Sequence, residues 1–182
     1  MKDDARIEGP RIAISGKSGC GNTTVSKLVS ELLGLRFINF TFRSLALERG
    51  MSLEEVLTQA AADDSWDREV DQRQLSIARE TGGCVLGSRL AIWMLGEADL
   101  KVYLTAAPET RAKRIVKREG GTIESVAAFT AERDRQDRER YLRIYNIDND
   151  DYSFADLVVD TDTLDPKGIA DLIAAKVKEK LS

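Results

Sequence analysis

Residues 11–24 read RIAISGKSGCGNTT and carry the strongest structural signal in the chain. Its first part, residues 11–15, is a short apolar run that ends at a glycine, as a buried parallel strand does. Residues 23–33 follow with apolar side chains at helical spacing, and Gly34 ends that helix. A glycine-rich turn between strand and helix points successive backbone N–H groups inwards, where the helix N-terminus adds partial positive charge. The stretch therefore predicts a phosphate-binding loop.

One residue of this loop departs from the motif G-x-x-x-x-G-K-[ST]. Thr23 stands where the motif has the hydroxyl that binds Mg²⁺, but Asn22 stands where it has a lysine. An asparagine can donate a hydrogen bond, yet it brings no charge to the β- and γ-phosphates. Lys17 is the nearest other cation. We expect it either to reach the donor phosphates or to be a solvated loop lysine, and the residues alone favour neither.

Composition excludes several classes of protein. The 182 residues carry 27 basic and 31 acidic side chains, a net charge of −4 that does not favour general nucleic-acid binding. The absence of histidine removes His-based acid–base catalysis and most zinc chemistry. No apolar run is long enough to span a bilayer, and residues 1–11 lack the apolar centre of a signal peptide. Two cysteines make no disulfide framework. We therefore expect a cytoplasmic protein.

The order of elements predicts an α/β fold. Short apolar strands that alternate with helices form a parallel sheet covered by helices on both faces. Ser52 and Glu55 have the spacing of a capping box, and Thr122 and Asp165 also stand at helix starts. The expected strands are residues 11–15, 36–40, 84–86, 100–104 and 157–160, and the expected helices are residues 23–33, 52–62, 66–80, 108–119, 122–145 and a last one from 166.

A run of arginines lies in the second-last of these helices. Residues 133–140 contain four arginines, and Arg133, Asp137 and Arg140 share one helical face. Guanidinium groups neutralise phosphates well, although alternating charge on its own is more typical of a solvated helix. Its occurrence together with a phosphate loop favours a phosphate-binding role.

The sequence closely resembles the archaeal-type cytidylate kinases, from about residue 11 to the C-terminus. The resemblance implies the P-loop kinase fold as a single domain, residues 1–182, with helical nucleotide-binding and lid segments, the lid at about 120–145. It also implies transfer of the γ-phosphoryl group of ATP, with Mg²⁺, to CMP or dCMP. The segments that carry it are RIAISGKSGCGNTT (11–24), INFTFRSLALERGMSLEE (38–55), VDQRQ (70–74), GSRLAIWM (87–94), ERDRQDRERYLRIYNID (132–148) and FADLVVDT (154–161).

The resemblance also implies roles for single residues. Arg89 and Arg133 would act on the transferred phosphoryl group. Thr23, as the hydroxyl of the loop motif, is the candidate metal ligand, and Lys17, as the cation of the loop, is a further catalytic candidate. The residues implied for CMP are Arg43, Arg68, Arg73, Arg89, Asp137 and Arg140. The residues implied for the ATP phosphates are Gly16, Lys17, Ser18, Gly19, Cys20, Gly21, Asn22, Thr23 and Thr24.

A second departure lies at Gly87, where relatives usually have an acidic residue that organises Mg²⁺ or its waters. Together with Asn22 it keeps two other functions open. One is a P-loop kinase with another acceptor, such as AMP, UMP or shikimate, and the other is a nucleotide-binding regulator with little transfer activity. We expect a monomer whose partners are small nucleotides, without nucleic acid or membrane.

Overall fold

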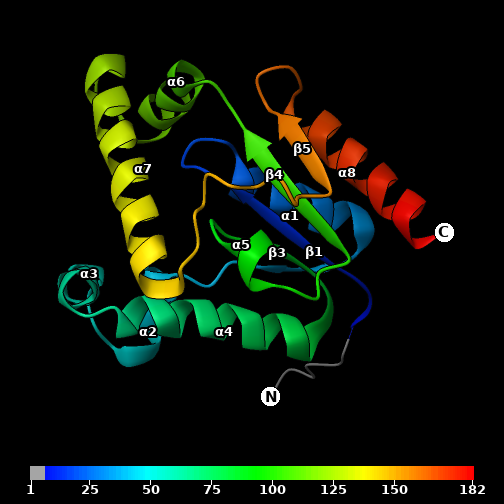
Figure 1. Ribbon diagram of the computed structural model, residues 1–182, viewed down its shortest axis with the longest axis horizontal. Coiled ribbons are helices and arrows are strands. Elements are labelled where there is room, and N and C mark those ends of the chain that lie inside the picture. Colours follow the sequence, from blue (N-terminus) through cyan, green and yellow to red (C-terminus); the bar gives the residue numbers. More distant parts are fainter. Residues whose placement is uncertain (1–6) are drawn as a thin grey trace.

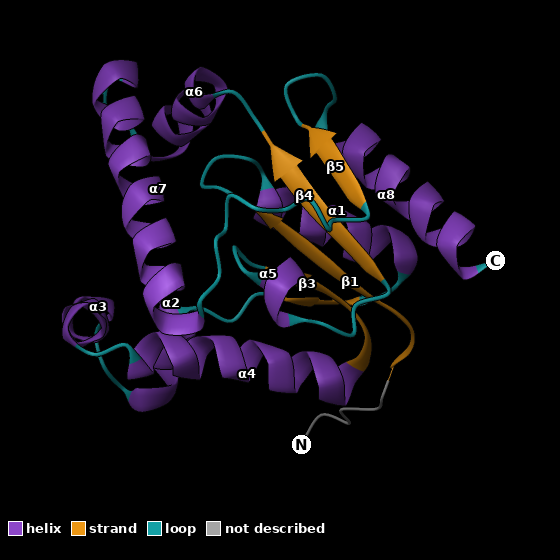
Figure 2. Ribbon diagram, viewed as in Figure 1, coloured by secondary structure: helices purple, strands orange, loops and turns teal. Residues whose placement is uncertain are grey.

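A computed structural model describes residues 7–182, so part of the segment that we judged not to be a signal peptide lies outside the described residues. The expected parallel sheet is confirmed: five strands pair in the order β2-β3-β1-β4-β5, and every recorded pair is parallel (Figure 2). The strands are β1 (Ile7–Gly16), β2 (Arg36–Ile38), β3 (Gly82–Gly87), β4 (Leu100–Thr105) and β5 (Leu157–Asp160).

Helices cover both faces of this sheet (Figure 1). α1 (Asn22–Leu33) and α8 (Pro166–Leu181) pack on one face, and α4 (Ser65–Thr81) and α5 (Ala91–Met94) pack on the other. Because both faces are buried, the strands are almost continuously apolar, as parallel strands are. The remaining helices are α2 (Phe42–Arg49), α3 (Leu53–Ala62), α6 (Pro108–Glu119) and α7 (Ile123–Tyr145).

The central strand shows how the core is divided. Side chains alternate along β1, so Ile12 and Ile14 enter the cluster under α1 and α8, while Ala13 enters the cluster under α4 and α5. All three are fully buried. A third apolar cluster, which includes Leu45 and Val56, joins α2 and α3 to α4 away from the sheet.

Local signals set the helix starts as the sequence predicts. Ser52 caps α3 in a capping box, since its amide donates to Glu55 Oε2 at 2.8 Å and the Glu55 amide donates back to its hydroxyl at 3.2 Å. Thr122 and Asp165 accept backbone hydrogen bonds at the starts of α7 and α8. Two short helices, α2 and α5, have too little periodicity to be predicted from the residues alone.

Across residues 7–182, no helix combines the length and the apolar composition needed to cross a bilayer. α7 instead stands beside the sheet and packs on α6 (Figure 1). Parallel α/β sheets bind ligands at the carboxyl ends of their strands. α7 faces the loops at those ends, where β1 runs into α1.

Candidate active site

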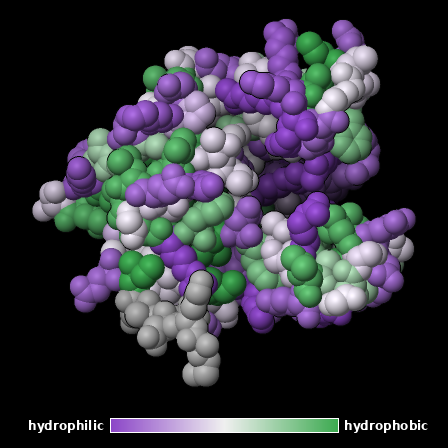
Figure 3. All heavy atoms as spheres, turned by 180° about the vertical axis from the view of Figure 1, so that it is seen from behind, coloured by the Kyte–Doolittle hydropathy of each residue, from purple (hydrophilic) through white to green (hydrophobic). Residues whose placement is uncertain are grey.

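A cleft of about 1540 Å³ opens at the carboxyl ends of the strands. Its walls are the loop at residues 16–24, the segment after β2, one face of α4, the end of β3, one face of α7 and the loop between β5 and α8. Figure 3 shows the molecule hollowed at this place, with mainly hydrophilic residues around the hollow. The predicted phosphate-binding loop forms its floor.

The loop has the backbone shape that phosphate binding requires. Gly19 and Gly21 adopt φ angles of 85° and 94°, in the left-handed region that favours glycine. At Gly16 the backbone is packed so closely that an added Cβ would lie 2.6 Å from the carbonyl oxygen of Leu104. The Cys20 amide closes a turn on the Lys17 carbonyl at 3.1 Å. The glycines therefore allow the chain to curl where α1 begins.

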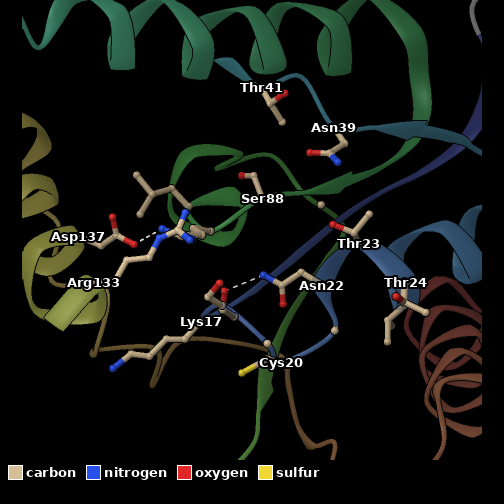
Figure 4. A pocket seen from close by; sticks show the side chains of 18 of the residues that line it. Lys17, Cys20, Asn22, Thr23, Thr24, Asn39, Thr41, Ser88, Arg133 and Asp137 are labelled. Carbon is tan, nitrogen blue, oxygen red and sulfur yellow. Dashed lines mark hydrogen bonds and ion pairs between the residues drawn. The ribbon is translucent and has the colours of Figure 1, made fainter. Parts of the chain in front are cut away.

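Neither Asn22, at the position of the motif's lysine, nor Lys17 is directed at the centre of this curl. The Asn22 amide nitrogen donates to the Gly16 carbonyl at 2.6 Å, so this side chain closes the loop from within. Lys17 extends away from Asn22 (Figure 4), and its Nζ lies 2.6 Å from Asp150 Oδ1 in a half-exposed ion pair. To reach a phosphate, Lys17 would have to leave Asp150.

Two arginines of α6, which the sequence reasoning missed, support the loop from outside. Arg111 Nε donates to the Ser18 carbonyl at 2.7 Å, and its other nitrogens form a bidentate pair with Asp134 of α7 at 2.7 and 2.9 Å. Arg114 donates to the Gly19 carbonyl at 3.2 Å. These bonds use carbonyl oxygens, so they occupy none of the loop's N–H groups.

On the opposite wall, one aspartate joins two arginines. Asp137 of α7 is only 6% exposed and pairs with Arg89, which follows β3, and with Arg140 Nη2 at 3.0 Å. The resemblance implies that Asp137 contacts CMP. In this structure its carboxylate pairs with the two guanidinium groups, and Asp137 also lines the cleft. The main-chain turn before Arg89 is fixed by the buried Ser15, whose hydroxyl donates to the Ser88 carbonyl at 2.9 Å.

Arg133 differs from its neighbours on α7. Within residues 7–182 it has no recorded hydrogen bond or ion pair, and its exposed side chain lines the cleft on the same side as Asp137 (Figure 4). Its guanidinium pKa is lowered from the ordinary value, first by burial and then by the positive charge of Arg89. An anion between Arg133 and Arg89 would relieve that repulsion.

Gly87 is a glycine because α1 leaves no room for a side chain there. A Cβ at this position would lie 2.5 Å from Ser26 Oγ and 2.8 Å from Ser26 Cβ. Ser26 is fully buried, and it lies one turn into α1. Close packing of α1 on β3 therefore excludes an acidic side chain at this position.

The magnesium ion that the sequence predicts would be held by Thr23 together with a bound nucleotide. Among the described residues, no group of three or more acidic, histidine or cysteine side chains could hold a metal. Figure 4 shows neutral oxygen-bearing side chains around one space beside the loop: Thr23, Asn39, Thr41 and Ser88. Mg²⁺ usually keeps several waters and binds through substrate phosphates, so a threonine hydroxyl at Thr23 fits it.

The remaining predicted arginines divide into two kinds. Arg43, in the first turn of α2, lines the cleft. Arg68 and Arg73 do not: Arg68 donates to the Ile144 carbonyl at 2.9 Å, and Arg73 lies 3.2 Å from Glu48. Each residue of a helix turns by about 100°, so the cleft face of α4 carries other positions. Those positions are Asp67, Val70, Asp71 and Gln74.

The cytidylate kinase-like family matches residues 11–163 of the chain. "Cytidylate kinase 2" of Borreliella afzelii is 45% identical over 174 residues, 93% of this chain and 97% of that protein. "Cytidylate kinase" of Pyrococcus horikoshii is 43% identical over 168 residues, 91% of this chain and 87% of that protein.

Solved structures share the fold at low sequence identity. A shikimate kinase from Acinetobacter baumannii superposes with a TM-score of 0.66 at 18% identity, covering 93% of each chain. Deoxyadenosine kinase from M. mycoides superposes with a TM-score of 0.57 at 17% identity, covering 92% of this chain and 99% of that one. Both have the arrangement of P-loop kinases, which confirms the predicted fold class.

Proposed function

The chain belongs to the cytidylate kinase-like family, and from this premise we propose that it transfers the γ-phosphoryl group of ATP to CMP or dCMP. The products are ADP and CDP or dCDP. The observation that carries the proposal is the pair of cations on the cleft wall, Arg89 and Arg133. Arg89 and Arg133 lie across the cleft from the loop at residues 16–24 and its backbone N–H donors. A phosphoryl group bound between the arginines and the loop therefore meets donors on both sides.

The two nucleotides occupy the two ends of the cleft. The loop between β5 and α8, with Arg114 and Arg118, lines one end, where we place the base of ATP. The cleft face of α4 and the start of α2 line the other end, where we place CMP. Arg43 then meets the CMP phosphate. Arg68 and Arg73 have no role in this assignment, because neither lines the cleft.

The reaction needs no side-chain base. A phosphate oxygen of CMP is already a charged nucleophile, so catalysis consists of alignment and neutralisation of charge on the transferred group. Arg133 is available for this without breaking a bond to protein, and Arg89 is kept in place by Asp137. Mg²⁺, bound by the ATP phosphates and Thr23, would supply further positive charge.

Lys17 would supply a second cation after giving up Asp150. Exposed ion pairs contribute only about 0–1 kcal/mol, so exchanging this carboxylate for a phosphate costs little. The exchange would also release the segment that joins α7 to β5, to which Asp150 belongs.

Closure of α7 over the cleft would exclude water, which would otherwise accept the phosphoryl group. The cleft lining carries large exposed apolar side chains that closure could cover: Phe129 of α7 is 65% exposed, and Leu57 of α3 is 47% exposed. We propose that the lid, residues 120–145, closes on both nucleotides. We further propose that the protein works as a single-domain monomer in the cytoplasm.

An acceptor panel tests the function. Purified protein is incubated with ATP and Mg²⁺ and with CMP, dCMP, UMP, AMP, GMP or shikimate, and ADP release is measured. We expect CMP and dCMP to give the largest kcat/KM. AMP or shikimate in first place would identify a kinase with another acceptor, and ATP binding without acceptor-dependent ADP release would identify a regulator.

A further inference from the structure

We infer that Asp71, positioned by Tyr145, selects the acceptor base by accepting a hydrogen bond from the exocyclic amine of cytosine. This inference rests on the proposed function and names the residue that separates CMP from UMP. Asp71 lines the cleft from α4, at the end that we assign to the acceptor nucleotide. The Tyr145 hydroxyl, from the last turn of α7, donates to Asp71 Oδ2 at 2.6 Å.

Asp71 differs from the other aspartates of this wall in its partners. Asp137 pairs with Arg89 and Arg140, and Asp67 lies 3.4 Å from Arg140 Nε. Among the described residues, no ion pair of Asp71 is recorded. An ionised carboxylate has about four acceptor positions; the Tyr145 hydroxyl fills one and the Gln74 amide another. Asp71 therefore has acceptor positions left for a ligand.

A neighbouring side chain supports the same reading. Gln74, one turn further along α4, is 4% exposed, and its Nε2 lies 3.4 Å from Asp71 Oδ1. Its Oε1 is buried without a partner among the residues that the structure describes. Buried polar atoms are nearly always hydrogen-bonded. The pair thus offers acceptors on two side chains, which suits a ligand group with two hydrogens to donate.

The negative charge of Asp71 favours contact of Asp71 and Gln74 with the base of the acceptor nucleotide and not with its phosphate. The acceptor phosphate belongs near Arg43, Arg89 and Arg133, because a carboxylate would repel it. Asp71 contacts Tyr145, the last residue of α7. The loop at residues 16–24 is instead linked through Arg111 to Asp134, near the middle of α7. The base is the uncharged part of the nucleotide that can extend to this place.

The chemistry of the two pyrimidines then gives the selectivity. Cytosine presents an amine at the position where uracil presents a carbonyl oxygen. An amine can donate to Asp71 and Gln74, whereas a carbonyl would place an acceptor against acceptors. Sites built to bond one hydrogen-bonding group reject a ligand that leaves their buried polar groups unpaired.

The first test is Asp71→Asn, which keeps the size of the side chain and adds a donor. The ratio of kcat/KM for CMP to kcat/KM for UMP should fall by at least ~10-fold, through a gain with UMP as well as a loss with CMP. Glu69→Gln, an exposed change on the same helix, should leave the ratio unchanged. An unchanged ratio in Asp71→Asn would overturn the inference, while failure of the wild-type protein to use CMP would overturn the proposed function.

A second test uses pH and keeps the carboxyl group. Burial raises the pKa of Asp71 to about 6; Asp67 adds to this, while the Tyr145 hydrogen bond and Arg140 oppose it. Arg68, over the Tyr145 ring, is the other charged group recorded here. A protonated Asp71 can donate to the uracil oxygen. The CMP-to-UMP ratio of the wild type should therefore fall as the pH is lowered through about 6.

Tyr145→Phe removes a bond that lowers the pKa of Asp71, so the fall should begin at a higher pH. Both acceptors carry the same phosphate, and its own titration cancels in the ratio. Equilibrium binding of CMP and UMP without ATP, measured by calorimetry over the same pH range, separates selection from turnover. A wild-type ratio that stays flat between pH 5 and 8 would overturn the inference, even if Asp71→Asn does not fold.

Discussion

Arg111 and Arg133 lie on neighbouring helices beside the same loop, yet they are used in different ways. Arg111 of α6 is 6% exposed and gives its donors to the Ser18 carbonyl and to Asp134. Arg133 of α7 is exposed in the cleft and, among the described residues, has no recorded hydrogen-bond partner. The Arg111 guanidinium stabilises the folded protein, whereas the Arg133 guanidinium is available to bind a ligand.

The comparison teaches that residue type does not decide the role of an arginine. A guanidinium group has five N–H donors, and those already bonded to protein cannot neutralise a transferred phosphoryl group. The donors that stay unbonded, close to a second positive charge, mark the catalytic position. By this criterion we propose that Arg133 is catalytic and Arg111 is structural, so mutations of the two should affect different measurements.

The largest expected effect is on turnover. Arg133→Ala removes a stabiliser of transition-state charge, so kcat should fall about 10³-fold, equivalent to about 4 kcal/mol. The melting temperature should change little, because no bond to protein is lost. Steady-state ADP release and thermal unfolding of the same preparation measure both quantities.

The matched control is Arg135→Ala on the same helix. Arg135 is exposed and paired with Glu132 and Glu139, so the kcat of Arg135→Ala should equal that of the wild type. Equal losses in the Arg133 and Arg135 variants would show that α7 needs only its overall positive charge. The distinction between bonded and unbonded arginines would then be wrong.

Arg111→Ala should reverse the pattern and lower stability first. Removing one partner of a buried pair leaves Asp134 uncompensated, at a cost of about 3 kcal/mol. For a chain of this size the melting temperature should fall by about 10 °C. Lys113→Ala, which breaks an exposed pair on the same helix, should change it by less than about 2 °C. An Arg111 variant of normal stability would refute the structural role.

The sequence predicts contacts between neighbouring residues and misses contacts between residues that are far apart in the chain. The loop at residues 16–24 and the capping box at Ser52 follow from spacing, because their geometry involves neighbouring residues. Arg111 and Ser18 are 93 positions apart, and Asp71 and Tyr145 are 74 apart. Only the packing of α6 and α7 against the rest of the chain brings these pairs together.

Helix phase explains the main misassignment within the site. Arg68 and Arg73 belong to the resembling segment of α4 or flank it, but both project beside the cleft face that Asp67, Asp71 and Gln74 form. Which face of a helix meets the cleft depends on tertiary packing. The sequence pattern of α4, with charges all around it, does not define that face.

The effect of Lys17 on turnover should be intermediate between those of Arg111 and Arg133. Lys17 is bonded, but only to the exposed Asp150, so it can be recruited. Lys17→Ala should lower kcat about 10²-fold, and Asp150→Asn should lower the KM for ATP by about 2-fold, since freeing the lysine gains at most about 1 kcal/mol. Initial rates at varied ATP measure both. If Lys17→Ala leaves kcat unchanged, the arginines of α7 alone supply the positive charge that Asn22 lacks.

The smallest expected effect concerns a carboxylate, Asp71, and the pH dependence of its contribution to stability. Burial raises the pKa of Asp71 to about 6, above its unfolded value of about 3.9. The folded state therefore holds this proton more tightly, and stability is lost as the pH rises from about 4 through about 6. Asp71→Asn should raise the melting temperature relative to wild type at pH 8, and the gain should vanish near pH 4.

Glu55→Gln is the control of opposite sign for that experiment. Hydrogen bonds from Ser52 lower the pKa of Glu55, so its contribution is present at neutral pH and is lost in acid. This variant should be less stable than wild type at pH 8 and equal to it at low pH. Asp71→Asn variants that follow the same direction would contradict the assigned burial of Asp71.

The division between Arg111 and Arg133 is tested most directly by a crystal structure with ADP, CMP, Mg²⁺ and aluminium fluoride, which mimics the transferred phosphoryl group. The account predicts α7 closed over the cleft, with a guanidinium nitrogen of Arg133 about 3 Å from a fluoride. Arg111 should keep its bonds to Ser18 and Asp134. A complex in which Arg133 points into solvent, or in which Arg111 turns to the fluoride, would contradict it.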